Sequence, residues 1–278
     1  MPKFLYHYTS IETLALILKN KTMRLNSLKN VDDPTEIQSR DIEGVGKYIL
    51  VSCWTRQSEE SIPMWKMYSS SLRGVRIGMR EFPFRSHTIN KGEGYFTETC
   101  TSYFSKEILL EGNGTIIAHG LKLKKIRYTD NANELYPQVH SSDNPENFQR
   151  YLSGADISEC GEVRGNLSFE GIGVCKLECW KFQEEERYWA FVFPMTFRDL
   201  TTNHSAETQR ELYRRVLNKN TPAPYEYLDL ELDQNALDTC EIMVGPRTSI
   251  GEKIIVQDLI EKYCPSAKFQ ESTVRING

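Results

Sequence analysis

The sequence predicts an α+β fold, and three observations lead to this prediction. Short β-rich runs, such as the mostly apolar 47–54, recur along the whole chain. Between them lie helix starts with capping-box spacing, as in the pairs Thr9–Glu12 and Ser249–Glu252. Strands and helices follow one another in mixed order, which fits an α+β arrangement better than a doubly wound parallel sheet.

The first elements are bounded by clear start and stop signals. A short β-like run, Leu5 to Thr9, ends at a capping box, so a helix is predicted over about 10–20. Residues 23–27 have the composition of a short strand. Residues 33–36 (Asp-Pro-Thr-Glu) predict a second helix start with an Asp cap and Pro in the first turn, and two glycines at 44 and 46 end that helix.

The next elements form the centre of the predicted sheet. The run 47–54 is β-rich and mostly apolar, so it is predicted as a buried central strand. Residues 61–68 predict a short helix with Pro63 in its first turn, and 74–79 alternate as a strand does.

The middle of the chain is polar. Residues 84–115 give no clear element, whereas 115–118 and 121–128 predict strands. From 130 to 169 apolar residues are too few for a separate core, and the one predicted helix lies near 146–152. We therefore expect one domain over residues 1–278, with an insertion or lid at about 130–169.

The last hundred residues return to clearer elements, two of which end at stop signals, Asn218 and Gly245-Pro246. The predictions are a helix or turn over 175–187, a very apolar strand over 188–193, a helix over 206–217, a strand over 239–246, a helix from Ser249 to about Cys264 and a strand over 268–276.

Composition limits the classes of function. The 278 residues are 39% hydrophobic and 26% charged, with no secretory signal and no apolar run of membrane-spanning length, so a cytoplasmic protein without a membrane partner is expected. A net charge of −4 argues against general binding of nucleic acid. The basic segment 122–127 reads either as a strand with a solvated face or as a polyanion contact.

The motifs of common metal and phosphate sites are missing from the sequence. Seven cysteines without a Cys-x-x-Cys pair argue against a disulfide framework or a zinc ribbon, and we interpret them as reduced thiols. Cys175 and Cys179 have no neighbouring His to complete a ligand set, so no metal is expected. Neither a glycine-rich dinucleotide loop, a phosphate loop nor a nucleophile elbow occurs.

Polar and aromatic residues instead gather at the ends of predicted elements. Met64-Trp65-x-x-Tyr68 places two aromatics on one helix face, where they either stack on a flat ligand or pack in the core. Three acids at 184–186 either form a solvated surface or include a carboxylate that pairs with Arg187 or Lys181. The other clusters are His7-Tyr8-Thr9, Arg24 with Asn26-Ser27, and Ser52-Cys53-Trp54-Thr55.

Together these segments resemble a bacterial family of uncharacterised domains related to abortive-infection (AbiGi-like) proteins. The resemblance covers most of the chain and is weakest in its polar middle. The segments that carry it are Tyr6 to Ser10, Asp32-Asp33-Pro34-Thr35-Glu36, Cys53-Trp54-Thr55, Met64 to Tyr68 with Gly74, and Trp180 to Arg187. This chain departs from the family pattern at Asp32 (usually Asn), Met67 (usually His) and Gln183 (usually Glu). If relatives use that His as a catalytic base, Met67 of this chain cannot replace it.

The order of an early His-Tyr-Thr, a central strand and a late Glu is similar to ADP-ribosyltransferases. This similarity implies a mixed, split β-sheet core flanked by helices and NAD as the substrate, with no metal. By position, His7 would hold the adenosine-side ribose, and Tyr8, Thr9 and Arg24 would be its neighbours.

The same similarity assigns roles at the reacting end of NAD. Trp65 or Tyr68 would stack on nicotinamide, and Ser52 or Thr55 would support the site. Glu185 would stabilise the oxocarbenium-like charge that develops on the ribose. The Gln183-x-Glu185 spacing is similar to that of protein-modifying transferases, which implies that Gln183 would orient the acceptor. In an extended segment residues two apart point the same way, so we expect both to face one ligand.

The resemblance implies a toxin or phage-defence effector that transfers ADP-ribose to an unknown macromolecule, either protein or nucleic acid. A partner protein that restrains this activity is one option that the sequence leaves open. Two alternatives stay open. One is a non-enzymatic sensor or partner-binding protein on the same scaffold, in which His7 and the acidic run are structural. The other is a nucleic-acid-acting enzyme such as a nuclease, which the basic segment would serve.

Overall fold

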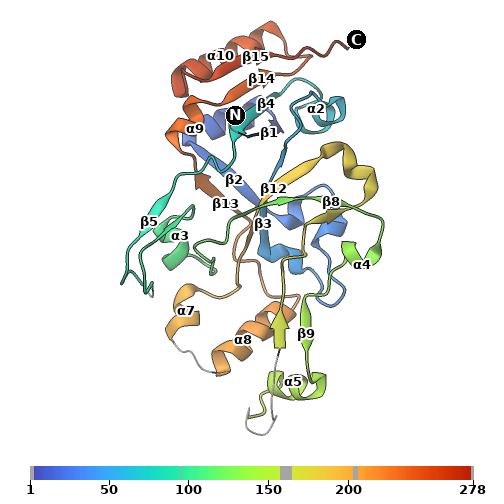
Figure 1. The fold of residues 1–278 in the computed structure, drawn as a ribbon, viewed down its shortest axis with the longest axis vertical. Helices are drawn as coiled ribbons and strands as arrows, with labels where there is room; N and C mark the ends of the chain where they lie inside the picture. Colours follow the sequence, from blue (N-terminus) through green and yellow to red (C-terminus); the bar gives the residue numbers. More distant parts are fainter. Residues whose placement is uncertain (1–2, 95, 157–164, 203–205, 277–278) are drawn as a thin grey trace.

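A computed structural model describes residues 3–94, 96–156, 165–202 and 206–276 (Figure 1). Its centre is a nine-stranded mixed sheet in the order β13-β2-β3-β1-β4-β14-β15, with β12 paired to β3 and β7 paired to β12. The strands are β1 (Phe4–Thr9), β2 (Thr22–Ser27), β3 (Ile49–Thr55), β4 (Val75–Arg80), β7 (Lys122–Lys125), β12 (Glu185–Phe191), β13 (Tyr227–Glu231), β14 (Glu241–Val244) and β15 (Lys268–Glu271). A mixed sheet with helices around it confirms the predicted α+β class.

The sheet divides at β3, which is the predicted buried central strand. β12 pairs with one edge of β3 along its whole length, from Ile49 to Thr55. The opposite edge is shared, because β2 pairs with Leu50 and Val51 whereas β1 pairs only with Thr55. Residues 52–54 therefore have no strand beside them on that edge, and β1 and β2 separate there.

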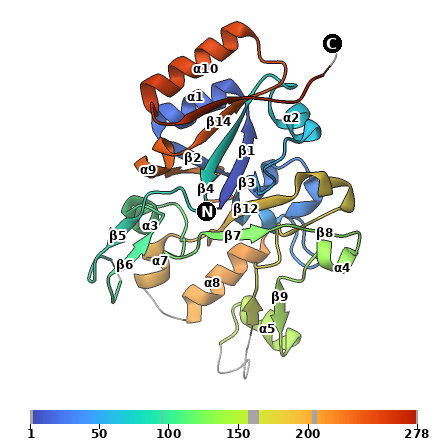
Figure 2. The same ribbon diagram turned by 45° about the horizontal axis from the view of Figure 1, so that its top comes forward.

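Two helices cover the part of the sheet that contains β1, β4 and β14. α1 (Ile11–Asn20) packs against α10 (Ile250–Tyr263), and the two lie together at one end of the molecule in Figure 2. The predicted capping box of Ser249 and Glu252 is confirmed at the start of α10. At α1 the predicted cap was wrong by one residue. Ser10 accepts the hydrogen bond of the Thr13 amide, because Thr9 still pairs with Val75 as the last residue of β1.

The helix predicted from residue 34 was also wrong in extent. Asp33 caps only a 3₁₀ turn, η2 (Pro34–Ile37), which lies between two further turns, η1 (Leu28–Asn30) and η3 (Val45–Tyr48). The turn ends at Gln38, whose backbone is extended, and within it Glu36 turns inward to a buried arginine, Arg187. Local capping signals were right about the start of the element and wrong about its length.

Several elements of the middle and the C-terminal third were not predicted. The predicted strand 115–118 is only a bridge between Thr115 and Phe193, and the predicted strand 121–128 is divided into β7 and β8. The unpredicted elements are β5 (His87–Ile89), β6 (Cys100–Ser102), α3 (Lys106–Glu111), α7 (Phe197–Thr202), β13 and α9 (Gln234–Asp238). The remaining short elements are α2 (Ile62–Tyr68), β8 (Arg127–Tyr128), β11 (Cys175–Lys176) and η4 (Glu178–Gln183).

The polar segment 130–169 contains elements of its own. They are α4 (Ala132–Leu135), β9 (His140–Ser142), α5 (Pro145–Leu152) and β10 (Gly165–Leu167). Phe148 and Tyr151 of α5 pack against Tyr213 and Leu217 of α8 (Ala206–Leu217). Residues 157–164 of this predicted insertion, with Cys160 among them, lie outside the described residues, as does His204.

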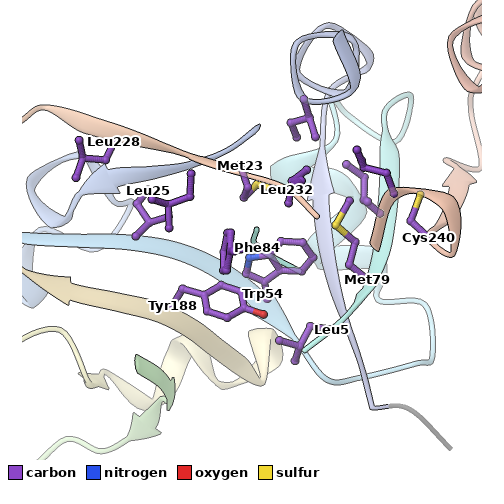
Figure 3. Packing of buried hydrophobic residues seen from close by; sticks show 14 of the residues in the cluster. Leu5, Met23, Leu25, Trp54, Met79, Phe84, Tyr188, Leu228, Leu232 and Cys240 are labelled. Atoms are coloured by element: carbon purple, nitrogen blue, oxygen red, sulfur yellow. The ribbon is translucent and has the colours of Figure 1, made fainter. Parts of the chain in front are cut away.

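On the core face of the sheet, aromatic rings of β3 and β12 pack against each other (Figure 3). The Tyr188 ring meets the rings of Trp54 and Phe84 edge-on, at centroid distances of 6.0 and 4.8 Å. Leu5 and Leu25 belong to the same buried cluster. This packing holds β3 rigidly against β12, so the divided edge of β3 has a stable position. No helix in the described part of the chain is long and apolar enough to cross a membrane.

Two glycines, one in a crowded position and one in an open position, provide a matched test of how closely the backbone packs. A Cβ on Gly74 would lie 2.2 Å from the Thr9 carbonyl oxygen, at the junction of β1 with the end of α2. Gly74→Ala should therefore lower the free energy of unfolding by about 1–3 kcal/mol. Gly251, in the first turn of α10, has no atom within 4 Å of an added Cβ, so Gly251→Ala should raise it by up to about 1 kcal/mol. Urea denaturation measures both, and a loss of stability in both variants would contradict this packing.

Candidate functional site

A cavity of about 600 Å³ opens where the sheet divides. It is lined by residues of α1, β1, β2, β3 and α2, by the loop around Asp32, and by Lys176, Gln183 and Glu185. His7 and Glu185, which are 178 positions apart, thus share one cavity. Its volume lies in the range of sites for small molecules and cofactors. No described residue of the segment 130–169 lines it.

His7 is held on β1 by a single hydrogen bond across the division. Its Nδ1 lies 2.8 Å from the carbonyl oxygen of Cys53, which has no strand partner on this edge of β3. Because a carbonyl only accepts, Nδ1 carries the proton and Nε2 keeps a lone pair. Burial lowers the pKa of His7 below its ordinary value, so the ring is neutral at pH 7. The geometry therefore gives the cavity one neutral imidazole acceptor.

The three consecutive acids have three different environments. Glu184 is exposed in a left-handed turn, with a φ of 40°. Glu185 faces the cavity, whereas Glu186 points to the other side of the sheet, where Arg56 binds its two carboxylate oxygens at 2.7 and 2.5 Å. The same Arg56 also pairs with Glu81. The run is therefore neither wholly exposed to solvent nor wholly directed at the cavity.

Glu185 belongs to a buried ion network with Glu36, Lys176 and Arg187. Its Oε1 accepts from Arg187 Nε at 2.7 Å, and its Oε2 accepts from Lys176 Nζ at 2.6 Å. Arg187 Nη1 also donates to Glu36 Oε2 at 2.5 Å, and Lys176 Nζ lies 3.2 Å from Glu36 Oε1. Two acids balance two bases, which is the arrangement that buried charges require.

The network affects the two acids differently. Burial alone would raise the pKa of Glu185, but Arg187 and Lys176 hold it below its ordinary value. For Glu36, burial outweighs the same two cations and raises the pKa. Glu185 is therefore a fixed anion at the cavity wall, with most of its acceptor capacity already in use.

The sequence identified only part of this network. Pairing of Glu185 with Arg187 was one of two alternatives, and the other candidate, Lys181, is exposed and lies near Glu178. Glu36 and Lys176 were not recognised as site residues. A lone lysine in the apolar run 172–177 was the available signal for a buried cation. Nothing local identified Glu36, because its partner Arg187 is 151 positions away.

Gln183 and Tyr68 extend the network toward the cavity mouth. Lys176 Nζ donates to Gln183 Oε1 at 2.8 Å, and Gln183 Nε2 donates to the Tyr68 hydroxyl at 2.6 Å. Burial and the nearby Asp32 raise the pKa of Tyr68, which stays protonated. Gln183 and Glu185 do face one cavity, but the extended segment expected for them is absent, since Gln183 ends η4 and a left-handed turn follows.

The two candidate stacking residues on α2 are separated by the structure. Tyr68 lines the cavity, whereas Trp65 is fully buried and does not line it. The Trp65 ring meets Tyr8 edge-on at 4.8 Å, and its Nε1 donates to Glu60 at 3.0 Å. Met67, one of the three departures from the pattern of the resembled family, is exposed and does not line the cavity.

The remaining predicted residues lie around the same cavity, with one exception. Tyr8, Thr9 and Ser52 line it, and Ser52 Oγ accepts from Trp54 Nε1 at 3.0 Å. Thr55 is buried elsewhere, where its hydroxyl donates to the Glu184 carbonyl. Arg24 lies at the rim and pairs with Asp229, a residue that the sequence did not single out.

Three of the four bases in the segment 122–127 form ion pairs with acids. Lys122 and Lys124 both pair with Glu170, and Arg127 pairs with Glu134. Within the described ranges, no group of three or more His, Cys, Asp or Glu side chains is placed to hold a metal ion. Comparison with known protein families, with curated proteins and with solved structures gave no match.

Breaking the buried network should cost far more stability than breaking an exposed ion pair. Arg187→Met leaves two buried acids, Glu36 and Glu185, with Lys176 as the only cation of the network, which should lower the free energy of unfolding by about 3–5 kcal/mol. The exposed pair of Lys219 with Glu43 is the control, and Lys219→Met should cost less than about 1 kcal/mol. Denaturant titration compares the two variants. Equal losses would mean that burial of the network has no energetic weight.

The lowered pKa of His7 predicts a pH dependence of stability. Below about pH 6.5 His7 binds a proton in the unfolded chain more readily than in the folded chain. The free energy of unfolding should therefore fall as pH falls. His7→Asn keeps a donor for the Cys53 carbonyl but does not titrate. The variant should therefore lose less stability between pH 7 and pH 5 than the wild type, and identical pH profiles would contradict the assignment.

Proposed function

We propose that this chain binds NAD in the divided-sheet cavity and transfers its ADP-ribose group to a macromolecule or to water. The observation that carries the proposal is the convergence of His7 and Glu185 on one cavity of suitable volume. The ADP-ribosyltransferase-like fold belongs to the same proposal. It is supported by the division of the sheet beside the central strand β3.

The proposed reaction begins with breakage of the bond between ribose C1′ and the nicotinamide nitrogen. The bonding electrons go to nicotinamide and cancel its positive charge, while C1′ gains oxocarbenium character. The anion of Glu185, which is itself buried at the cavity wall, stabilises that charge. An acceptor oxygen or nitrogen then attacks C1′ and releases its proton to solvent.

The other lining residues act as positioning groups in this proposal. His7 Nε2 accepts a hydrogen bond from a ribose hydroxyl of the adenosine half. Tyr68 offers its ring to nicotinamide, and Gln183, which already donates to the Tyr68 hydroxyl, orients the acceptor. Thr9 and Ser52 add hydroxyls to the wall between these two ends.

A second candidate is a nucleotide-binding sensor without turnover, and one observation favours it. Arg187 and Lys176 already take both oxygens of Glu185, and their positive charges oppose a developing cation nearby. In this alternative the network has a structural role in the wall of a nucleotide-binding site, and a partner protein recognises the nucleotide-bound form of the chain.

Adjacent carboxylates on opposite faces of the sheet provide the decisive experiment. Glu185→Gln should lower nicotinamide release from NAD by about 100-fold or more, with little change in NAD affinity. Glu186→Gln is the matched control, because its side chain pairs with Arg56 on the other face and should leave the rate within about twofold.

Three outcomes of that experiment differ in meaning. Loss of turnover with retained binding supports the transferase. Binding of NAD by the wild type without any nicotinamide release supports the sensor. Absence of NAD binding, measured by calorimetry on wild-type protein with an intact thermal transition, contradicts both candidates.

A further inference from the structure

The cavity contains few cations that could meet the phosphates of a nucleotide. Only two of its lining residues are basic, Arg24 and Lys176, and three are acidic, Asp32, Glu185 and Asp229. Lys176 is buried and bound to the network, so it is not available. A ligand with a pyrophosphate group therefore has Arg24 as its one charged partner among the described lining residues.

Arg24 is held by an acid at the rim of the cavity. It lies on β2 directly opposite Asp229 on β13. Its Nε and Nη2 donate to the two carboxylate oxygens of Asp229, each at 2.8 Å. The guanidinium also lies 3.6 Å from the centre of the Tyr227 ring, which fixes its plane.

This geometry is the one with which arginine binds phosphate. A flat guanidinium forms two parallel hydrogen bonds equally well with a carboxylate or with two phosphate oxygens. The side chains of Arg24 and Asp229 are 48% and 36% exposed, and ion pairs at such exposure contribute little to stability. Exchange of Asp229 for a phosphate is therefore inexpensive.

We propose that Arg24 is the anion-binding residue of the cavity and that Asp229 is a built-in competitor for it. In the free protein Asp229 occupies the phosphate position. A nucleotide displaces the carboxylate, so Asp229 weakens the binding of every phosphate-bearing ligand and leaves neutral ligands unaffected. This inference rests on the proposed function only in that the ligand is a nucleotide.

The alternative is that the Arg24–Asp229 pair has only a structural role and joins β13 to β2. The two hypotheses predict different effects of the same substitution on ligand affinity. A purely structural pair predicts that Asp229→Asn leaves ligand affinity unchanged or weakens it. A competitor predicts that Asp229→Asn strengthens the binding of phosphate-bearing ligands, because it frees the guanidinium of Arg24.

The experiment measures calorimetric binding of ADP-ribose and of adenosine, which carries no phosphate. Asp229→Asn should tighten ADP-ribose binding by about 3- to 10-fold and leave adenosine binding within about twofold. Arg24→Gln should weaken ADP-ribose binding by a similar factor. In the Arg24→Gln background, Asp229→Asn should give no gain.

The control is a neighbouring pair on the same strand. Glu231 of β13 pairs with Arg85 and does not line the cavity, so Glu231→Gln should change neither affinity. Unchanged or weaker ADP-ribose binding in Asp229→Asn overturns the inference, and so does an equal gain for adenosine. Failure of ADP-ribose to bind both wild type and Asp229→Asn overturns it as well.

These results are separable from those on turnover. ADP-ribose lacks the bond that the proposed reaction breaks, so its affinity is measured whether or not the chain cleaves NAD. If ADP-ribose binds more tightly to Asp229→Asn but no nicotinamide is ever released, the competitor stands and the transferase falls. If NAD is cleaved but Asp229→Asn does not change ADP-ribose affinity, the transferase stands and the competitor falls.

Discussion

The acidic side of the cavity depends on a buried, charge-balanced network of Glu36, Lys176, Glu185 and Arg187. These side chains come from η2, β11 and β12, so the network fixes three separate segments at the wall of one cavity. Such a network stabilises a fold only when every member is present, because each lost partner leaves a buried charge. We therefore regard it as the constraint that positions Glu185, whatever the ligand proves to be.

The position of His7 in the cavity has a different physical basis. There, a strand edge that neither β1 nor β2 fully covers leaves the Cys53 carbonyl free, and His7 satisfies it. The cavity lining thus includes a fixed anion and a neutral acceptor, together with Tyr68 and Gln183, which are hydrogen-bonded to each other. The division of the sheet creates both the space and the open backbone group that orients the imidazole.

Local signals in the sequence predicted elements well and side-chain environments poorly. The helices at 206–217 and 249–264 and the strand at 47–54 follow from caps and apolar pattern, which involve neighbours within one turn or strand. The spacing of Trp65 and Tyr68 placed both on α2, but only tertiary packing decides that Tyr68 faces the cavity. The pairing of Glu36 with Arg187 depends on chain folding over 151 positions, which no local pattern encodes.

The opposite directions of Glu185 and Glu186 make the length of this segment matter more than its composition. Alternation along β12 sends one carboxylate to the cavity and the next to Arg56. Loss or gain of one residue between Gln183 and Arg187 would exchange the two faces and bring the wrong side chain to each partner. Evolution of this chain can therefore accept substitutions in the segment far more readily than insertions or deletions.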